Sequence, residues 1–369
     1  MRVVVIGAGV IGCCAALRLA EAGARVSLVS ETGPGATLSA HSFGWANAID
    51  DGSSAYYDLS VEALAAQERL AVDTAESPQW LWRRGNLHWA DDAPGAAALR
   101  DTAAGYREHG YPVAELSPAE VRRELEPGLR FDGVAGPVYF YPDDMHVMGD
   151  LMLSAVLRRA RSAGVRLRIG EPVATVFPDG SGVRFRDGES LAADAVLCCA
   201  GRGNIELLAG LGVALPLLEP GSPQRLTRGL LVRTTRVAEP VTRVVHAPGL
   251  SIRPDHDDRL MLHCHDLDHT LTADSDALAL ADRILDRLPA VLPGAAGARV
   301  ESLFVGVRPM PRDGRSIVGP VRDAEGVYVV ATHSGMTLAP VLAEIAAREV
   351  LGTPDPSAAA FRPERFALL

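Results

Sequence analysis

The sequence predicts an α/β protein in which a domain built on a parallel sheet is interleaved with a second domain built on a mixed, largely antiparallel sheet. Two units made of an apolar strand, a small turn and a helix lie at residues 2–31 and 326–351. Between them, short segments of residues 226–264 alternate apolar and polar residues, as strands with one solvated face do. We expect the two terminal units to meet, which places their helix N-termini side by side.

The N-terminal unit carries a glycine pattern that is typical of dinucleotide-binding sites. Residues 3–6 are apolar and uncharged, as a strand buried on both faces must be. In the turn that follows, Gly7 permits a sharp bend, Gly9 lets the backbone approach a pyrophosphate, and Gly12 lets the helix pack closely on the strand. The pattern therefore predicts a site for phosphate groups at the end of this strand.

Val10 and Ile11 begin the predicted helix, and Glu31 ends the second strand of the unit. The first N–H groups of the helix and its positive dipole end favour phosphates. The Glu31 carboxylate can accept hydrogen bonds from an unphosphorylated ribose and would repel a 2′-phosphate. Together these features indicate an adenine dinucleotide site; a βαβ unit with a purely structural role is the alternative.

Apolar spacing and turn residues predict the other elements. Residues 56–75 have a helical period, with an apolar face made by Leu59, Leu64, Leu70 and Val72. The same period predicts helices over residues 148–163, 277–288 and 338–351. Prolines punctuate residues 77–145, where we expect short strands and helices. Further strands are predicted over residues 165–169, 173–177, 183–185, 226–234, 241–246, 250–253 and 260–264.

Composition narrows the classes of function. With 369 residues, of which 48% are hydrophobic, the chain is long enough for two domains with substantial cores. A net charge of −10 argues against nucleic acid and against an anionic membrane surface as partners. Glycines and charges interrupt the apolar N-terminal segment, so we expect a cytoplasmic protein that is not an integral membrane protein. All 36 basic residues are arginines, which excludes a lysine base, a Schiff-base lysine and a P-loop.

Three further motifs follow the glycine pattern along the chain. They are an Ala-Gly turn at residues 196–201, a Gly-x-Arg-Pro-x-x-x-Asp-Gly segment at residues 306–314, and a His-Ser-Gly-Met turn at residues 333–336. With these motifs in this order, the whole chain resembles the D-amino-acid oxidase family of FAD enzymes, the group that holds glycine oxidase, sarcosine oxidase and D-amino-acid dehydrogenase. The resemblance implies a Rossmann-type FAD-binding domain and a substrate-binding domain. We expect the former over residues 1–50, 146–215 and 303–369, and the latter over residues 51–145 and 216–302.

The resemblance also implies which residues contact FAD. A loop at residues 32–47 would run under the flavin, Val173 would lie near the adenine, and Met336 and Thr337 would face the pyrimidine edge of the flavin. Members of the family that hold FAD covalently use a cysteine just before the Arg-Pro segment, where Val305 and Val307 stand here, so we expect noncovalent FAD. The predicted cofactor contacts are Gly7, Gly9, Val10, Ile11, Gly12, Glu31, Ser39, His41, Ser42, Asn47, Val173, Ala200, Gly201, Gly306, Arg308, His333, Ser334, Gly335, Met336 and Thr337.

Arg308, His263 and His265 are the catalytic candidates. The resemblance implies that Arg308 reaches over the flavin and binds a substrate carboxylate through its two-pronged guanidinium; a structural ion pair is the alternative. His263 and His265 alternate onto one face of a predicted strand, where they would form a polar pocket wall over the flavin. A solvent-exposed strand end is the alternative. A metal site is not expected, because no further paired ligands occur at suitable spacing.

No second glycine motif for a nicotinamide cofactor is present, so the electrons must come from the substrate. We expect an FAD-dependent amino-acid or amine oxidase or dehydrogenase that transfers a hydride from the C–N carbon to flavin N5 and leaves an imine. The alternatives are an FAD-bearing accessory subunit of a larger amine dehydrogenase complex and, less favoured because the Gly-Asp motif of aromatic hydroxylases is missing, a flavin monooxygenase. The electron acceptor would be O2 or a redox partner, and the lack of lysine favours the partner. Both a homo-oligomer and a hetero-oligomer are compatible with the sequence.

Overall fold

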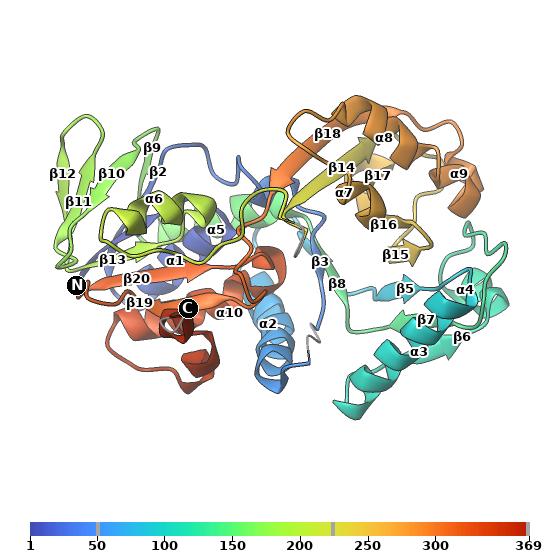
Figure 1. Cartoon of the computed structure of the whole chain (residues 1–369), viewed down its shortest axis with the longest axis horizontal. Coiled ribbons are helices and arrows are strands. Elements are labelled where there is room, and N and C mark those ends of the chain that lie inside the picture. The colour runs from blue at the N-terminus through green and yellow to red at the C-terminus, as the bar shows by residue number, and fades with distance from the viewer. Residues whose placement is uncertain (49–51, 223–225, 367–369) are drawn as a thin grey trace.

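In the computed structural model, which describes residues 1–48, 52–222 and 226–366, the chain folds around two large sheets that lie side by side (Figure 1). The first sheet has six strands and joins the two terminal units, as predicted. The second has eight strands and is formed by two separate parts of the chain. The chain therefore passes from one sheet to the other and back more than once.

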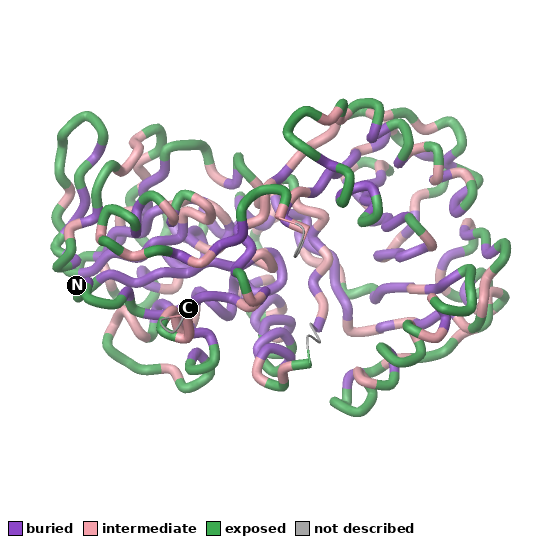
Figure 2. The backbone as a smooth tube through the Cα atoms, viewed as in Figure 1, coloured by how far each residue is buried: buried purple, intermediate pink, exposed green. Residues whose placement is uncertain are grey.

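The six-stranded sheet is parallel except at one edge. Its order is β19-β20-β13-β1-β2-β9, and only β19 and β20 run antiparallel. Alternate residues of β1 enter different cores: Val3 and Val5 lie in one, Val4 and Ile6 in the other, so the strand is buried on both faces (Figure 2). The strands are β1 (Arg2–Ile6), β2 (Arg25–Ser30), β9 (Arg166–Ile169), β13 (Ala195–Cys198), β19 (Ile317–Pro320) and β20 (Val327–Ala331).

Helices cover both faces of this sheet. One face packs against α1 (Val10–Glu21), α5 (Gly149–Ser162) and α10 (Gly335–Val350), and α2 (Ser54–Asp73) packs on α10. The other face carries α6 (Asn204–Ala209) and a small antiparallel sheet of β10 (Val173–Val176), β11 (Gly182–Phe185) and β12 (Ser190–Ala192). The helices predicted over residues 56–75 and 148–163 and the predicted hairpin at residues 173–185 are confirmed.

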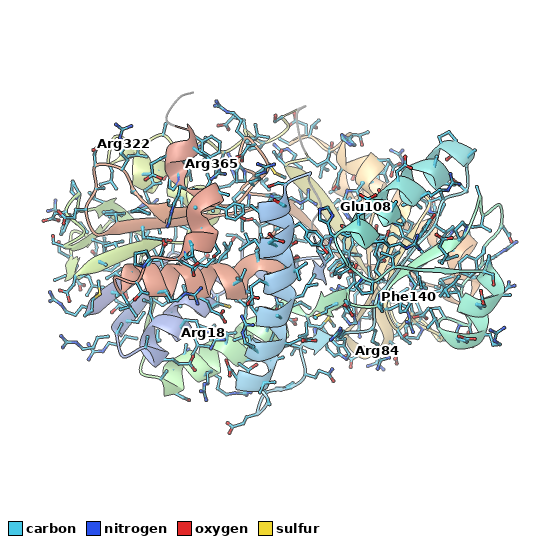
Figure 3. All side chains as sticks on the ribbon, turned by 90° about the horizontal axis from the view of Figure 1, so that it is seen from below. Arg18, Arg84, Glu108, Phe140, Arg322 and Arg365 are labelled. Carbon is cyan, nitrogen blue, oxygen red and sulfur yellow. The ribbon has the colours of Figure 1, made fainter. Side chains whose placement is uncertain are left out.

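Helix α2 stands between the two parts of the molecule. Figure 3 shows Arg18 on one side of it and Glu108 and Phe140 on the other. Arg18 binds Asp73 at the end of α2 at 2.7 Å and Glu344 of α10 at 3.5 Å, so an ion-pair network reinforces the packing of α1, α2 and α10. The prediction that Val72 lies on the apolar face of α2 is wrong: 75% of this residue is exposed, because two residues after buried Leu70 the helix has turned to its opposite face.

The eight-stranded sheet is antiparallel except where β5 pairs with β15. Its order is β18-β14-β17-β16-β15-β5-β7-β6. Its strands are β5 (Asn86–His88), β6 (Ala114–Leu116), β7 (Val138–Tyr141), β14 (Arg228–Thr234), β15 (Val244–Ala247), β16 (Leu250–Asp255), β17 (Arg259–His263) and β18 (Val300–Val307). The mixed, largely antiparallel sheet of the second domain is therefore confirmed.

Short helices surround this second sheet. They are α3 (Ala93–Glu108), α4 (Pro118–Glu124), α7 (His265–Asp268), α8 (Ala277–Leu285) and α9 (Leu288–Val291). The single helix predicted over residues 277–288 is wrong at its C-terminal end. Pro289 lies in the first turn of α9, where its missing N–H is tolerated, and a proline cannot continue the preceding helix.

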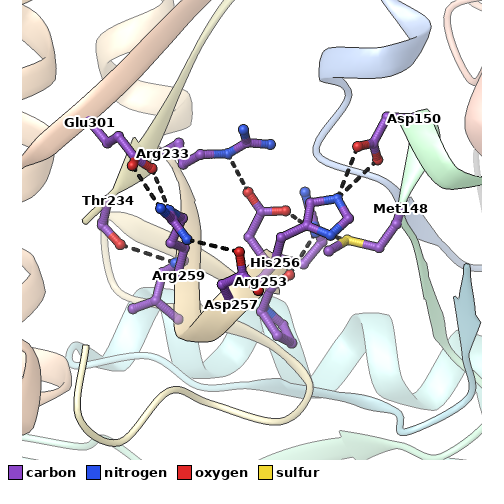
Figure 4. A network of polar contacts seen from close by, with 12 residues as sticks. Met148, Asp150, Arg233, Thr234, Arg253, His256, Asp257, Arg259 and Glu301 are labelled. Atoms are coloured by element: carbon purple, nitrogen blue, oxygen red, sulfur yellow. Dashed lines mark hydrogen bonds and ion pairs between the residues drawn. The ribbon is translucent and has the colours of Figure 1, made fainter. Parts of the chain in front are cut away.

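A third small sheet connects the two parts, with β8 (Met145–Val147) between β3 (Trp45–Ala46) and β4 (Leu81–Trp82). Polar contacts reinforce this connection (Figure 4). Arg253 of β16 donates to the Met148 sulfur at 2.7 Å, and His256 lies 3.0 Å from Asp150 at the start of α5. These contacts hold the second sheet against the helix layer of the first.

The division into two domains remains a proposal, and the structure adds three facts to it. Strand β18 spans the proposed boundary between residues 302 and 303 and belongs to the eight-stranded sheet. Helix α2, assigned to the substrate-binding domain, shares its core with α1 and α10. The boundary between residues 50 and 51 lies outside the described residues.

Candidate active site

A cavity of about 1150 Å³ lies between the two sheets. Its walls include the glycine turn after β1, the loop that follows β2, the 332–337 turn, and the ends of β14, β15, β17 and β18. Every predicted site residue lines this cavity except Gly12, which lies behind the turn. Segments far apart in the chain thus converge on one space that is large for a single small substrate.

The glycine turn has the geometry that its sequence predicts. Gly7 has φ +103°, and a Cβ added there would lie 2.6 Å from the Cys199 carbonyl oxygen. A Cβ at Gly12 would lie 1.9 Å from the Gly7 oxygen, so only glycine lets α1 pack this closely on β1. Ser39 accepts a hydrogen bond from the Val10 N–H at 3.0 Å and thereby fixes the loop against the N-terminus of α1.

Glu31 follows β2 and lines the cavity, as predicted, but it already has a partner. Its carboxylate lies 3.0 Å from the Arg186 guanidinium, which follows β11, and more than half of each side chain is exposed. Sequence reasoning missed Arg186, because nothing in the chain indicates that this hairpin reaches the end of β2. In this exposed position the ion pair is weak and can rearrange around a ligand.

The Ala-Gly turn after β13 is held by Asn204, a residue that the sequence did not single out. Asn204 is fully buried; its side-chain oxygen accepts the Ala200 N–H at 2.9 Å, and its amide donates to the Val330 carbonyl at 3.1 Å. One side chain therefore fixes the ends of β13 and β20 at the cavity. An Asn three residues after an Ala-Gly turn is the only sequence signal for it.

The C-terminal turn differs from its prediction, because α10 begins at Gly335 and not at residue 338. Met336 and Thr337 thus lie in the first turn of the helix. Pro340 has no N–H to bond the Met336 carbonyl, and buried Gln67 of α2 donates its amide to that oxygen at 2.5 Å and to the Thr337 oxygen at 3.2 Å. Gln67 was missed; the proline in a helical pattern was the available signal for an unpaired carbonyl.

The remaining predicted contacts line the cavity from the loop after β2 and from neighbouring segments. His41 stacks on Phe304 with ring centroids 4.4 Å apart, and Ser42 accepts a hydrogen bond from the Gly44 N–H at 3.2 Å. Asn47 donates to the Ala48 carbonyl at 2.7 Å. The others in contact with this space are Ile11, Val173, Gly201, Gly306, His333 and Ser334.

Arg308 lies across β14 at the far end of the cavity. Its guanidinium donates to the Arg228 carbonyl at 2.7 Å and lies 3.6 Å from the Asp268 carboxylate. A Cβ added at Gly229 would lie 2.6 Å from this guanidinium, so glycine makes the space that Arg308 occupies. With 27% of its side chain exposed and several N–H groups unbonded within the described chain, Arg308 can bind a carboxylate in the cavity.

His263 and His265 both line the cavity, but not as two residues of one strand. Strand β17 ends at His263, and His265 begins α7, so the predicted alternation on a strand is wrong. The chain turns between them, and their rings still meet, with centroids 4.4 Å apart. The turn lets Asp268, at the end of α7, reach back to His263 at 2.6 Å.

Burial and neighbouring charges shift the pKa values of Asp268, His265 and His246. Burial alone would raise the pKa of Asp268, but the hydrogen bond from His263, the Leu230 N–H and the Arg308 charge lower it overall. Although His265 is exposed by area, the cavity walls desolvate it, and this together with His263 lowers its pKa to about 4. Burial also lowers the pKa of His246, a missed cavity residue, well below its usual value.

His263, His265 and Asp268 offer ligand atoms within 4.8 Å of one another, a spacing that could hold a metal ion. However, both Asp268 oxygens already accept hydrogen bonds, and the Arg308 cation lies 3.6 Å away. A second cation beside this arginine would be repelled. The Arg308 charge and the two histidines are therefore better suited to binding an anionic, proton-donating molecule than a metal cation. That the protein binds no metal remains a prediction.

Among the described helices, none is long and apolar enough to cross a membrane.

Comparisons with known proteins agree over the whole chain. A family model described as "FAD dependent oxidoreductase" (DAO) matches residues 2–349. A glycine oxidase from Pseudomonas aeruginosa is 28% identical, over 98% of this chain and 99% of its own. The crystal structure of glycine oxidase from Geobacillus kaustophilus superposes with a TM-score of 0.85 at 25% identity, covering 99% of each chain. An L-amino acid deaminase from Proteus vulgaris has the same fold, with a TM-score of 0.84 at 20% identity over 99% of this chain and 93% of its own.

Proposed function

Because the chain belongs to the DAO family of FAD-dependent oxidoreductases, we propose that it oxidises the C–N bond of an amino acid, with the substrate carboxylate held by Arg308. The observation that carries this proposal is the position of Arg308, a partly exposed guanidinium at one end of the cavity whose other end is the glycine turn. A planar guanidinium with unbonded N–H groups matches a carboxylate. Relatives named glycine oxidase support an amino acid as the substrate.

The residues at the other end of the cavity fit FAD. The turn at Gly7 leaves no room for a side chain, and the N-termini of α1 and α10 both line the space. When bound there, FAD supplies the two-electron acceptor for the reaction. Glu31 would accept the ribose hydroxyls, and the 333–337 turn would hold the flavin ring; Val305 and Val307 offer no thiol, so the FAD is noncovalent.

The chain's own residues place and prepare the substrate. Arg308 fixes the carboxylate, and the walls made by Phe43, Trp45 and His246 exclude water from the α-carbon. No residue has to act as a strong base toward carbon, which agrees with a chain that has no lysine. The product is an imine, which water hydrolyses. The final electron acceptor, O2 or a redox partner, and a cytoplasmic location belong to the same proposal.

The test is anaerobic reduction of the purified, FAD-loaded protein by a panel of D-, L- and N-substituted amino acids. The loss of flavin absorbance measures the reduction. We expect at least one α-amino acid to bleach the flavin and the corresponding amine without a carboxylate to fail. Reduction by an amine lacking a carboxylate would overturn the amino-acid assignment. If no amine bleaches the flavin until a partner protein is added, the chain is an accessory subunit.

Acid precipitation tests the noncovalent attachment. The supernatant should hold all the flavin as intact FAD, and a yellow pellet would contradict it.

A further inference from the structure

We propose that Asp268 and His263 form a proton-accepting dyad that removes a proton from the ammonium group of the substrate while Arg308 holds its carboxylate. The inference deepens the proposed function and rests on it. In this inference the buried Asp268 carboxylate positions both Arg308, which binds the substrate, and His263, which accepts its proton. Neither His263 nor Asp268 belongs to the four motifs that the family resemblance uses.

Asp268 contacts three groups at the substrate end of the cavity. One of its oxygens accepts the backbone N–H of Leu230 at 2.9 Å, and the other lies 2.6 Å from His263 Nε2 and 3.6 Å from Arg308 Nη2. Only 1% of the Asp268 side chain is exposed. A buried carboxylate held by a backbone N–H is a rigid reference point, so Arg308 and His263 keep a fixed separation.

This contact determines which ring nitrogen of His263 can accept a proton. An ionised carboxylate accepts hydrogen bonds, so Nε2 carries the hydrogen that points at Asp268, and Nδ1 keeps its lone pair. Within the described residues Nδ1 has no hydrogen-bond partner, and His263 lines the cavity. The dyad therefore presents a basic nitrogen to whatever occupies this space.

The charged and aromatic groups that face His263 come from several elements. Asp268 stabilises an imidazolium at this position, and Arg308 opposes it. The other neighbours are His265 of α7, His246 of β15 and the Phe43 ring. Since the pKa values of His265 and His246 are lowered, both stay neutral near pH 7, whereas His263 has a hydrogen-bonded carboxylate partner.

The chemistry of the substrate needs such a base. A free amino acid enters as a zwitterion, and its ammonium nitrogen has no lone pair with which to form a C=N bond. In the proposed step one N–H bond of the ammonium group breaks, the proton forms a new bond to Nδ1, and the electron pair stays on nitrogen. The carboxylate of Asp268 stabilises the resulting imidazolium, as the buried aspartate of a hydrolase triad does. General-base assistance of this kind contributes about a hundred- to ten-thousandfold in rate.

The test compares His263→Ala with His269→Ala, a change at an exposed histidine of the same segment that does not line the cavity. The rate of anaerobic flavin reduction is measured against pH for the FAD-loaded proteins. We expect His263→Ala to be slower at pH 7 by about a hundred- to ten-thousandfold, and this deficit to shrink as rising pH deprotonates the free amino acid. Added imidazole should restore part of the rate in His263→Ala, and His269→Ala should behave as the parent.

A second measurement does not depend on turnover. Nitrogen NMR of the ¹⁵N-histidine-labelled protein should find His263 with hydrogen on Nε2, and Asp268→Asn should change this tautomer while FAD content stays normal. If His263→Gln is needed because the alanine variant folds poorly, the same pH dependence is expected of it.

The outcomes separate this inference from the proposed function. A parent protein that no amino acid reduces overturns both. A parent that is reduced while His263→Ala matches it at pH 7, or shows a deficit that neither pH nor imidazole alters, overturns the dyad alone. A hydrogen found on Nδ1 of His263 in the parent protein would also overturn the dyad alone.

Discussion

The two ends of the cavity are built in different ways. At the end assigned to FAD, the walls include three backbone segments: the Gly7 turn, the Ala200 turn and the start of α10. At the substrate end the walls include the Arg308 and His263 side chains, both of which contact Asp268. A turn that only glycine can form leaves a local pattern in the sequence, whereas the contacts that Asp268 makes with these two side chains leave none.

Apart from the changes at His263, the substitutions of Arg308 have the largest expected effect. Arg308→Ala removes both the charge and the planar fork, and Arg308→Lys removes only the fork, so kcat/KM should fall more in the first than in the second. Loss of a desolvated charge partner costs about 2–5 kcal/mol, or roughly thirty- to several-thousandfold. Steady-state kinetics measures the loss, and FAD content is the control; equal turnover by Arg308→Ala and the parent would make Arg308 structural.

Gly229→Ala moves the same arginine without changing it. The added Cβ would lie 2.6 Å from the Arg308 guanidinium, the flexible end of a side chain, which can shift. Because a displacement of about 1 Å at a binding group can cost up to about a hundredfold in rate, we expect lower kcat/KM with little change in melting temperature. Gly297→Ala is a suitable control, since its Cβ would meet no atom within 4 Å and the residue does not line the cavity. Unaltered kinetics in Gly229→Ala would show that the position of Arg308 is not critical.

At the FAD end, Gly12 and Gly9 have different roles: Gly12 lets α1 pack on β1, and Gly9 lets the backbone approach the cofactor. In Gly12→Ala the new Cβ would lie 1.9 Å from the Gly7 oxygen, which should destabilise the protein without FAD by about 1–3 kcal/mol. In Gly9→Ala the nearest atom would be the Ser39 hydroxyl at 3.4 Å, so the apo-protein should melt as the parent does and only FAD affinity should fall. Thermal unfolding with and without FAD checks both; equal behaviour of the two variants would contradict the assignment.

The smallest effect is expected at Glu31. Its removal costs hydrogen bonds to the ribose hydroxyls, but more than half of the side chain is exposed, so we expect FAD affinity to fall by about tenfold, near 1.4 kcal/mol. Arg186→Ala breaks the same ion pair and leaves the carboxylate in place. If both variants lose FAD equally, Glu31 acts through Arg186 and not through the ribose.

The difference between the FAD end and the substrate end of the cavity also explains how much could be predicted from the sequence. Most strands of the six-stranded sheet, the main helices and the turn at Gly7 follow from apolar spacing and from glycines that a side chain would not replace, whereas β18, β19 and the turn between His263 and His265 were not predicted. Arg308 was found through the family motif that contains it. Asp268 and Gln67 were not found, because each acts on a residue that is distant in sequence or lies across a turn: Asp268 depends on β17 ending at His263, and Gln67 depends on α2 packing beside α10.

The central claim is that an amino acid is held between an FAD-bearing backbone cradle and a side-chain wall anchored by Arg308. The most direct measurement is a titration of the FAD-loaded protein with a simple carboxylate such as acetate or glycolate. Binding is detected as a shift of the flavin absorbance spectrum. The parent should bind with a saturable spectral change that competes with substrate, and Arg308→Ala, with normal FAD content, should show none over the same range. Equal affinity of the two proteins for the carboxylate would contradict the account.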